Sequence, residues 1–178
     1  EKAYDLAKQL QSFLPSDRIL LFLGRELVFL KENFSRVEED RILTLRDCLL
    51  RPRHKSLIIA TPASFLFPLK SPQQLQKETI HLQTDQEWPS HSLLKQLVQS
   101  GYQRADTITR PGEFAVRGGL LDVFPVGEKN PCRIDLFGDT IESLRSFQVE
   151  TQRSISNQEQ LTITPADELY GEGLESTL

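Results

Sequence analysis

The glycines of this sequence do not form a recognisable nucleotide site. A phosphate-binding loop needs a Gly-rich turn whose amide groups face the phosphates, followed by a Lys and a Ser or Thr. None of the 9 glycines is followed by Lys, and neither G-x-x-x-x-G-K-S/T nor G-x-G-x-x-G occurs. We therefore expect that this chain does not hydrolyse ATP by itself and binds no cofactor.

The histidines and cysteines offer no catalytic pair either. Nucleophilic catalysis needs a Ser or Cys that a positioned base activates, but His54, His81 and His91 lie in polar surroundings outside any recognisable motif. Cys48 and Cys132 are far apart and have no Cys or His at the spacing of metal ligands. Such isolated thiols are typical of buried, reduced cysteines in a cytosolic protein. We expect surface histidines, no disulfide and no zinc site.

One acidic cluster, Glu38-Glu39-Asp40, has ligand chemistry that a metal ion could use. It stands, however, at the start of a predicted helix. Negative side chains there stabilise the positive end of the helix dipole, and this explanation suffices. We predict no catalytic residue and no metal site in the chain.

The outward face of one predicted strand, residues 132–137, is unusual. Alternation places three apolar side chains on the core side of this strand and leaves Arg133, Asp135 and Phe137 on the other side. In one interpretation the predicted helix 90–100, or a distortion of the sheet edge, buries Phe137, and Arg133 pairs with Asp135. In the other, the face docks a partner, because arginines and aromatic residues carry most interface energy.

Arg117 raises the same question. It ends the predicted strand 113–116 in the opposite phase to the apolar residues, directly before Gly118-Gly119. Its side chain is therefore expected to point outward beside a tight turn. It is either a solvated turn residue or a rigidly presented arginine that can bind a carboxylate.

Residues 1–77 alternate helices with short apolar strands, as in an α/β domain with a parallel sheet. The predicted elements are a helix over 2–14, a strand over 19–23, a helix from a capping box at Ser35 to Leu49, a strand over 57–60 and a helix that starts at Thr61-Pro62.

After residue 78 the period changes to two, which predicts a small α+β domain of antiparallel sheet packed on one helix. Its elements are a strand over 79–82, a helix over 90–100 with Ser90 as cap and Gly101 at its end, and strands over 113–116, 120–124, 133–137 and 140–147. An apolar alternation over 161–164 would return to the first sheet. We therefore predict a first domain over 1–77, an inserted domain over 78–157 and a return segment with an acidic tail over 158–178.

Composition gives no support to a membrane or nucleic-acid function. The chain has 21 Lys and Arg against 25 Asp and Glu, a net charge of −4, and no segment with a strong basic excess. No window approaches the run of about 18 apolar residues that a membrane span needs. The chain begins at Glu1 without a signal peptide and contains no Met. We expect a cytoplasmic protein, and either a piece of a longer chain or one whose Met residues were replaced.

Several ordered runs of this sequence resemble the UvrB-homology region of bacterial transcription-repair coupling factors. Residues 1–75 resemble this region in the order of their elements and at Glu39-Asp40-Arg41, more than in the identity of their other residues. The matching runs are Gly101-Tyr102-Gln103-Arg104, Pro111 to Pro125 (PGEFAVRGGLLDVFP), Pro131 to Asp139 (PCRIDLFGD) and Glu150-Thr151-Gln152-Arg153-Ser154.

The resemblance implies a degenerate, helicase-like (RecA-like) parallel-sheet domain into which a UvrA-binding domain is inserted. It implies that Arg117, Arg133 and Phe137 contact UvrA, so it favours the docking interpretation of the outward face. For the full-length protein it implies an ATP- and magnesium-dependent DNA translocase that displaces stalled RNA polymerase on duplex DNA. The parts that do this are expected outside this chain, which is itself no enzyme.

Two alternatives belong to other classes of function. The chain could be the front half of a UvrB-type ATP-dependent excision-repair helicase, which predicts a phosphate loop just upstream of Glu1 in the parent gene. It could instead be a nucleic-acid-binding module, which predicts duplex affinity that falls steeply with salt. The absence of a basic excess disfavours the second alternative.

Overall fold

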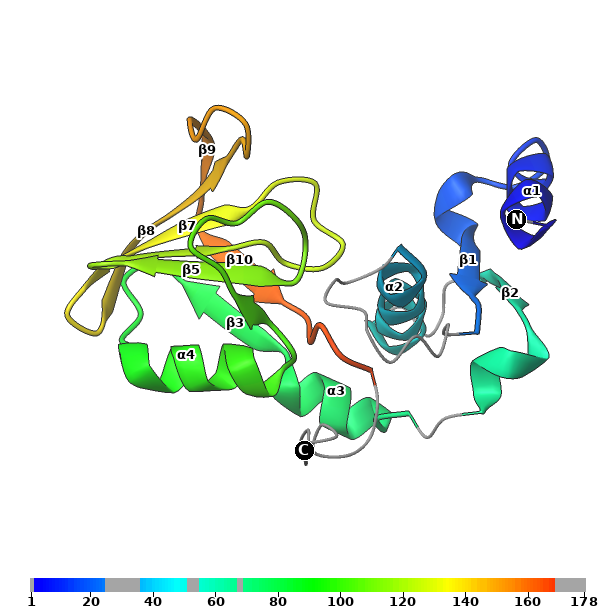
Figure 1. Cartoon of the computed structure of the whole chain (residues 1–178), viewed down its shortest axis with the longest axis horizontal. Helices are drawn as coiled ribbons and strands as arrows, with labels where there is room; N and C mark the ends of the chain where they lie inside the picture. The colour runs from blue at the N-terminus through cyan, green and yellow to red at the C-terminus, as the bar shows by residue number, and fades with distance from the viewer. Residues whose placement is uncertain (1, 25–35, 51–54, 67–68, 169–178) are drawn as a thin grey trace. The chain divides into compact units, whose positions relative to one another are not determined.

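The computed structural model describes residues 2–24, 36–50, 55–66 and 69–168, which divide into two units (Figure 1). Unit 1 comprises Glu1–Leu75 and Glu168–Leu178, and unit 2 comprises Gln76–Asp167.

Unit 1 is built on two parallel strands with helices beside them. β1 pairs with β2 in parallel, with Ile19 opposite Leu57, as predicted, but β2 is mostly exposed and not the buried strand that its apolar run predicts. The elements are α1 (Lys2–Leu10), η1 (Ser16–Arg18), β1 (Ile19–Phe22), α2 (Arg36–Leu50), β2 (Leu57–Ala60), η2 (Pro62–Phe65) and the start of α3 (Pro72–Glu78), which continues into unit 2 after Leu75. This unit is mixed α/β, and its described sheet has only these two strands.

The helix predicted to begin at Thr61 is wrong. Pro62–Phe65 form a single 3-10 turn, and the Thr61 side chain does not cap it. The Thr61 hydroxyl oxygen instead accepts a hydrogen bond of 2.9 Å from the backbone N–H of Gly24. Thr61 therefore does not start a helix, and its side chain instead connects the segment after β2 to the segment after β1. The capping box predicted at Ser35 lies outside the described residues.

A buried ion pair joins α2 to the segment that follows the last strand. Arg41 and Glu168 bond to each other, and their exposed fractions are 1% and 2%. Arg41 also donates to the carbonyl oxygens of Leu23 and Ser64 and lies 4.1 Å over the ring of Phe22. The chain thus returns to unit 1 at Glu168.

Unit 2 contains a two-stranded antiparallel sheet, a six-stranded sheet and one long helix (Figure 1). The smaller sheet pairs β3 with β10, and the larger has the order β4-β5-β6-β7-β8-β9. The elements are β3 (Ile80–Gln83), α4 (Ser90–Gln99), β4 (Gln103–Arg104), β5 (Glu113–Arg117), β6 (Leu120–Val123), β7 (Cys132–Phe137), β8 (Thr140–Phe147), β9 (Ser154–Gln158) and β10 (Gln160–Ile163). Apart from the parallel pair β4–β5, the neighbouring strands of the larger sheet are antiparallel, and the sheet and its helix agree with the prediction for this part of the chain.

The predicted return of strand 161–164 to the first sheet is wrong. Leu161 pairs with Leu82, and Ile163 pairs with Ile80, so β10 completes the sheet of unit 2. The strand β9, which precedes it, was not predicted. Its sequence, Ser154 to Gln158, is almost entirely polar, and its residues are mostly exposed, so it has no apolar alternation by which it could be recognised.

The ends of α4 were predicted with mixed success. Gly101 has a φ of +88°, and its N–H bonds to the carbonyl of Val98, as expected for a left-handed residue that ends a helix. Ser90, however, is not the cap. A side chain outside the helix satisfies its backbone N–H, which donates to a carboxylate oxygen of Asp139 at 3.0 Å.

Candidate docking site

The turns of two tight hairpins, β5–β6 and β7–β8, lie at the same end of the strands of the large sheet. Arg117 pairs with Leu120 across Gly118-Gly119, and Phe137 pairs with Thr140 across the turn that begins at Gly138. Gly118 and Gly138 have φ values of +61° and +62°. A glycine with positive φ at the first central position is typical of the two-residue turns that suit the twist of a hairpin. Arg117 and Phe137 therefore occupy equivalent places, each directly before the glycine of its turn.

Register and alternation define an outer face on this sheet. Leu120 lies opposite Asp135 on the neighbouring strand, and Asp122 lies opposite Arg133. A bulge in β8 after Asp135 preserves the alternation of β7. The outer face comprises the side chains of Arg117, Leu120, Asp122, Arg133, Asp135, Phe137 and Arg145.

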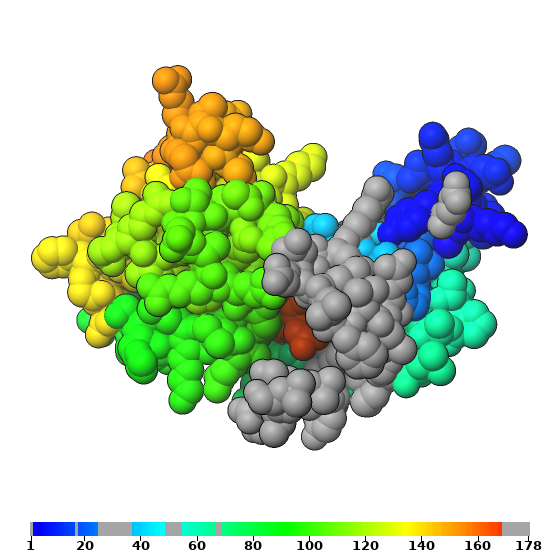
Figure 2. Space-filling model, in the orientation of Figure 1, coloured from blue at the N-terminus to red at the C-terminus, as the bar shows by residue number. Residues whose placement is uncertain are grey.

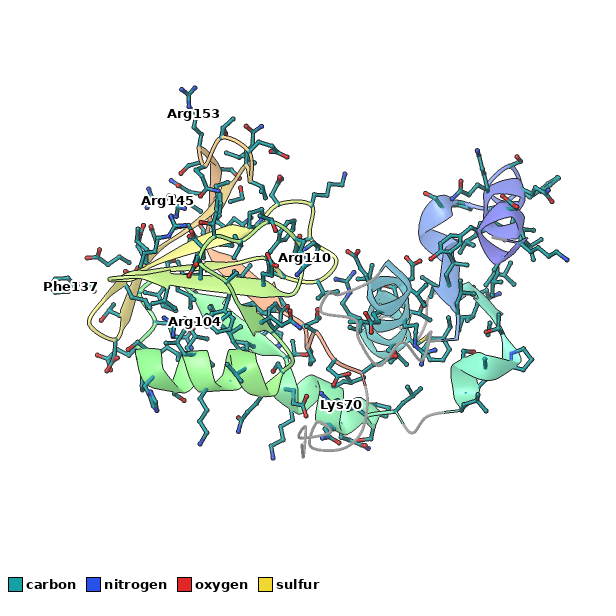
Figure 3. All side chains as sticks on the ribbon, viewed as in Figure 1. Lys70, Arg104, Arg110, Phe137, Arg145 and Arg153 are labelled. Carbon is teal, nitrogen blue, oxygen red and sulfur yellow. The ribbon has the colours of Figure 1, made fainter. Side chains whose placement is uncertain are left out.

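The ring of Phe137 is open to solvent. Its exposed fraction is 75%, and Figure 3 shows the side chain pointing away from the tip of the sheet. The interpretation in which the domain's own helix covers this residue is therefore wrong. Leu120, on the adjacent strand of the same face, is 36% exposed. Sequence reasoning missed Leu120, although its phase in the strand, two residues before Asp122, could have indicated it.

Arg133 is held by a two-point ion pair with Asp122. Its Nε and Nη2 atoms donate to the two carboxylate oxygens at 2.7 and 2.8 Å, and Nη2 also donates to Oε1 of Gln152 at 3.1 Å. The hydrogen bond with Asp122 is the main cause that raises the pKa of Arg133. The pairing of Arg133 with Asp135, which belonged to one of the two interpretations, is wrong. Asp122 comes from the neighbouring strand, and alternation within one strand cannot reveal it.

Three of the five N–H groups of the Arg133 guanidinium are therefore used. Its two Nη1 hydrogens have no partner among the described residues. The side chain remains 17% exposed, so Arg133 can still donate to an acceptor that approaches the outer face.

Asp135 pairs with an arginine that the sequence did not single out. Arg145 on β8 donates to Asp135, and Ser143 donates to the same carboxylate. The Nε atom of Arg145 is buried without a hydrogen-bond partner within the described parts of the chain. The outer face thus carries a third arginine, whose charge is balanced by Asp135.

Arg117 is exposed, and its contacts are all with neutral oxygens. Its Nη2 donates to the backbone carbonyl of Asp106 at 2.9 Å and to the hydroxyl of Thr107 at 2.6 Å. These two bonds hold the side chain against the loop that precedes β5. In the part of the chain that the structure covers, no carboxylate neutralises Arg117, which therefore keeps its charge and three free N–H groups for another acceptor.

An apolar cluster lies against Arg133. Phe147 is fully buried with Ile108, Ala115 and Phe124, and the guanidinium carbon of Arg133 lies 4.5 Å from the centre of the Phe147 ring. Stacking on an aromatic face and pairing with Asp122 together restrict the orientation of Arg133.

The hairpin that carries Phe137 is fastened to the start of α4. Asp139 binds the N–H of Ser90 through its carboxylate and the N–H of Trp88 through its backbone carbonyl, at 3.0 and 2.6 Å. Ile141 is bonded on both sides to the loop before the helix. These contacts hold Asp139 and Ile141, which follow Phe137 in the hairpin, so Phe137 is presented on a rigid support.

The remaining candidates do not gather into a site. No group of three or more His, Cys, Asp or Glu side chains that could hold a metal ion is found among the described residues, and none of their helices is long and apolar enough to cross a membrane. Cys132 is buried, and burial raises the pKa of its thiol to about 12. Cys48, which we expected to be buried, is exposed on α2.

Comparison with known proteins adds an independent result. The sequence pattern of the family described as the UvrB interaction domain matches residues 80–169. Three similar proteins are named transcription-repair-coupling factor. They come from Bacillus subtilis (35% identity over 63% of this chain), Escherichia coli (35% over 69%) and Staphylococcus aureus (33% over 94%).

This chain spans 10 to 14% of the length of these three relatives. The resemblance to transcription-repair coupling factors that residues 101–154 predicted is confirmed. The matched segment covers half of the chain and includes the sheet that presents Arg117, Arg133 and Phe137. The chain therefore belongs to the UvrB interaction domain family.

Proposed function

We propose that unit 2 docks the repair protein UvrA, and that the chain is the UvrA-recruiting module of a transcription-repair coupling factor in transcription-coupled nucleotide excision repair. One observation carries this proposal: the ring of Phe137 is 75% exposed on a rigid hairpin, beside Arg117 and Arg133 on the same face. An exposed phenyl ring with arginines around it is typical of interface anchors. The family name and the names of the relatives support the same function.

Phe137 is proposed to enter an apolar recess on UvrA. Leu120 lies beside it on the neighbouring strand and would cover the edge of that recess. Both side chains leave water on binding, and this transfer favours association in proportion to the apolar area that is buried. The hairpin contacts of Asp139 lower the entropy cost, since the ring is already presented before the partner arrives.

The two arginines are proposed to bind acidic groups at the margin of the recess, each in a different way. Arg117 supplies a full, unbalanced charge and three N–H groups. Arg133 supplies the two hydrogens of Nη1, while its charge is already balanced by Asp122. Arg117 therefore contributes more to long-range attraction, and Arg133 more to the geometry of the complex.

Titration of purified UvrA with the wild-type chain and with Phe137→Ala tests the proposal. Anchors of this kind typically cost about 2 kcal/mol or more when truncated, so we expect binding to weaken by at least roughly 30-fold. The fold is expected to persist, because substitutions at exposed positions usually change stability by less than about 0.5 kcal/mol.

Phe13→Ala is the matched control. Phe13 lies in unit 1 and is 83% exposed, so its truncation removes a phenyl ring of similar exposure from another surface. We expect its affinity for UvrA to equal that of the wild type. Equal affinities for a folded Phe137→Ala variant and the wild type would remove Phe137 from the site. A wild-type chain that does not bind UvrA would overturn the proposal as a whole.

The remaining proposals concern the longer protein. Unit 1 is proposed to be part of a degenerate helicase-like domain, with the parallel pair β1–β2 as part of its sheet. The full-length protein is proposed to be a cytoplasmic DNA translocase that uses ATP and magnesium and acts on RNA polymerase and duplex DNA through other domains. The present chain is proposed to be non-catalytic. The alternative of a UvrB-type helicase is not favoured, because the relatives reported above are coupling factors.

A further inference from the structure

The loop between β8 and β9 contains a strained residue next to Arg133. Gln152 has a φ of +56°, in the left-handed region that residues with a Cβ rarely adopt. The loop is closed by two backbone bonds, from Gln148 N–H to the Arg153 carbonyl at 3.0 Å and from Gln152 N–H to the Gln148 carbonyl at 2.8 Å. Figure 2 shows this loop, in orange, projecting from the surface of unit 2.

Both ends of the Gln152 amide are used. Its Oε1 accepts from Nη2 of Arg133 at 3.1 Å, and its Nε2 donates to the carbonyl of Val149 at 2.8 Å. Only this orientation of the amide satisfies both contacts, because a guanidinium can only donate and a carbonyl can only accept. The left-handed backbone at Gln152 therefore directs an oriented acceptor at Arg133.

This contact completes the restraint on the Arg133 guanidinium. Asp122 binds one edge of the group through Nε and Nη2, and Gln152 takes the second hydrogen of Nη2. With the Phe147 ring against its guanidinium carbon, the group cannot rotate without breaking at least one of these bonds. The two hydrogens of Nη1 are then the only ones left for an acceptor on a partner.

We propose that Gln152 is a positioning residue of the UvrA-docking face, which fixes the Arg133 guanidinium so that Nη1 is presented to an acidic or carbonyl acceptor. This inference rests on the proposed function. It adds a residue outside the strands of that face, and it explains why a residue with a Cβ occupies a backbone conformation that glycine would adopt without strain.

The variant Gln152→Gly tests the inference, because it removes the amide and at the same time relieves the strain of the positive φ. We expect the chain to stay folded and to bind UvrA about tenfold more weakly. Asp85→Gly is the matched control. Asp85 is the other described non-glycine residue of positive φ, at +63°, and no described contact joins it to Arg133. The glycine variant keeps the backbone N–H that donates to the carbonyl of Ile141, so the replacement is expected to leave the affinity unchanged.

A double variant separates positioning from a direct contact. In Arg133→Lys the fork that binds Asp122 and Gln152 together is lost, so adding Gln152→Gly is expected to cause no further loss of affinity. A tenfold loss that persists in the Arg133→Lys background would overturn the inference, and so would a Gln152→Gly variant that binds like the wild type. If Phe137→Ala still weakens binding in either of those cases, the proposed function stands without this inference. If the wild-type chain fails to bind UvrA, both fall.

Discussion

Arg133 and Arg145 stand opposite each other on β7 and β8, and each holds a different carboxylate. Asp122 bonds to Arg133 from the strand on one side, and Asp135, two residues further along β7, bonds to Arg145. Like charges directly opposite each other destabilise a sheet, and the two carboxylates offset this repulsion. The charge of Arg117 is the one on this face that no described carboxylate balances.

The first prediction concerns the pair of Arg133 with Asp122. Asp122→Asn keeps the shape of the side chain but leaves the partly buried guanidinium without its counter-charge. We expect a loss of about 2 to 3 kcal/mol in the free energy of unfolding, below the value for a fully buried pair because Arg133 is still partly exposed. Urea unfolding followed by circular dichroism measures this change.

Asp135→Asn is the control for this prediction. The side chain of its partner Arg145 is 35% exposed, so water can solvate the charge that is left behind, and the expected loss is smaller. An Asp135→Asn variant that is destabilised as much as Asp122→Asn would contradict this ranking of the two pairs.

The second prediction concerns Arg117. Because this side chain is exposed and bonds only to neutral oxygens, Arg117→Ala is expected to leave stability nearly unchanged and to weaken UvrA binding about tenfold, which corresponds to about 1.4 kcal/mol. Arg117→Lys keeps the charge but not the planar fork, so its affinity is expected to lie between the two. Isothermal titration calorimetry measures both variants.

Arg153→Ala is the matched control for Arg117. Figure 3 shows Arg153 on the β8–β9 loop, away from Phe137, and the described hydrogen bonds of Arg153 are made by its backbone. Its replacement by Ala therefore changes the net charge by the same amount and keeps the bonds that close the loop around Gln152. We expect wild-type affinity. A loss equal to that of Arg117→Ala would show that overall charge, rather than the position of Arg117, governs the interaction.

Local patterns predicted the strands that carry the site. Successive side chains of a strand point to opposite faces, so the alternation of β7 alone predicts that Phe137 points outward. Its exposed fraction of 75% confirms this. The partner of Arg133 depends instead on which strand lies next to β7. The sequence of β7 itself carries no information on this point, so Asp122 was missed.

The helix caps illustrate the same limit. Ser90 is the usual type of residue for the start of a helix, but a carboxylate 49 positions away, on Asp139, occupies the N–H at that place. The Thr61 hydroxyl oxygen likewise accepts a hydrogen bond from the backbone N–H of Gly24 and does not cap a helix. Propensity describes what a residue can do locally, and a stronger distant partner overrides it.

The third prediction concerns the close approach of the two hairpins. A Cβ added to Gly119 would lie 2.7 Å from the carbonyl oxygen of Leu136, an atom of rigid backbone. Gly119→Ala is therefore expected to cost about 1 to 3 kcal/mol of stability and to break the bond from the Leu136 N–H to the Gly119 carbonyl, 2.8 Å long. Faster hydrogen exchange of the Leu136 amide reports this break.

Gly118→Ala separates backbone strain from this clash. A Cβ at Gly118 meets nothing within 4 Å, but the φ of +61° disfavours any side chain. We expect it to cost about 1 kcal/mol or somewhat more while the Leu136 amide stays as protected as in the wild type, relative to global unfolding. Unchanged exchange at Leu136 in Gly119→Ala would mean that the two hairpins are not in close contact.

The fourth prediction concerns the two thiols. Cys132 is buried in the core of β7, and burial is the main cause that raises its pKa from 9.0 to about 12. The thiolate is the reactive form, so Cys132 is expected to resist a thiol reagent at pH 8 until urea unfolds the chain, whereas Cys48 is exposed and reacts in the native state. Two thiols that react at once in the folded chain would contradict the burial of Cys132.

The same pKa shift makes stability depend on pH. Below about pH 9 the thiol of Cys132 is protonated in both the folded and the unfolded chain, so it contributes no pH dependence. Between pH 9 and 12 the unfolded chain releases this proton and the folded chain keeps it, so the free energy of unfolding falls as pH rises, by at most about 1.4 kcal/mol per pH unit. Urea unfolding at pH 8 and pH 10 should therefore show a steeper loss for the wild type than for Cys132→Ala. Equal losses in the two proteins would mean that this thiol ionises as readily in the folded chain as in the unfolded one.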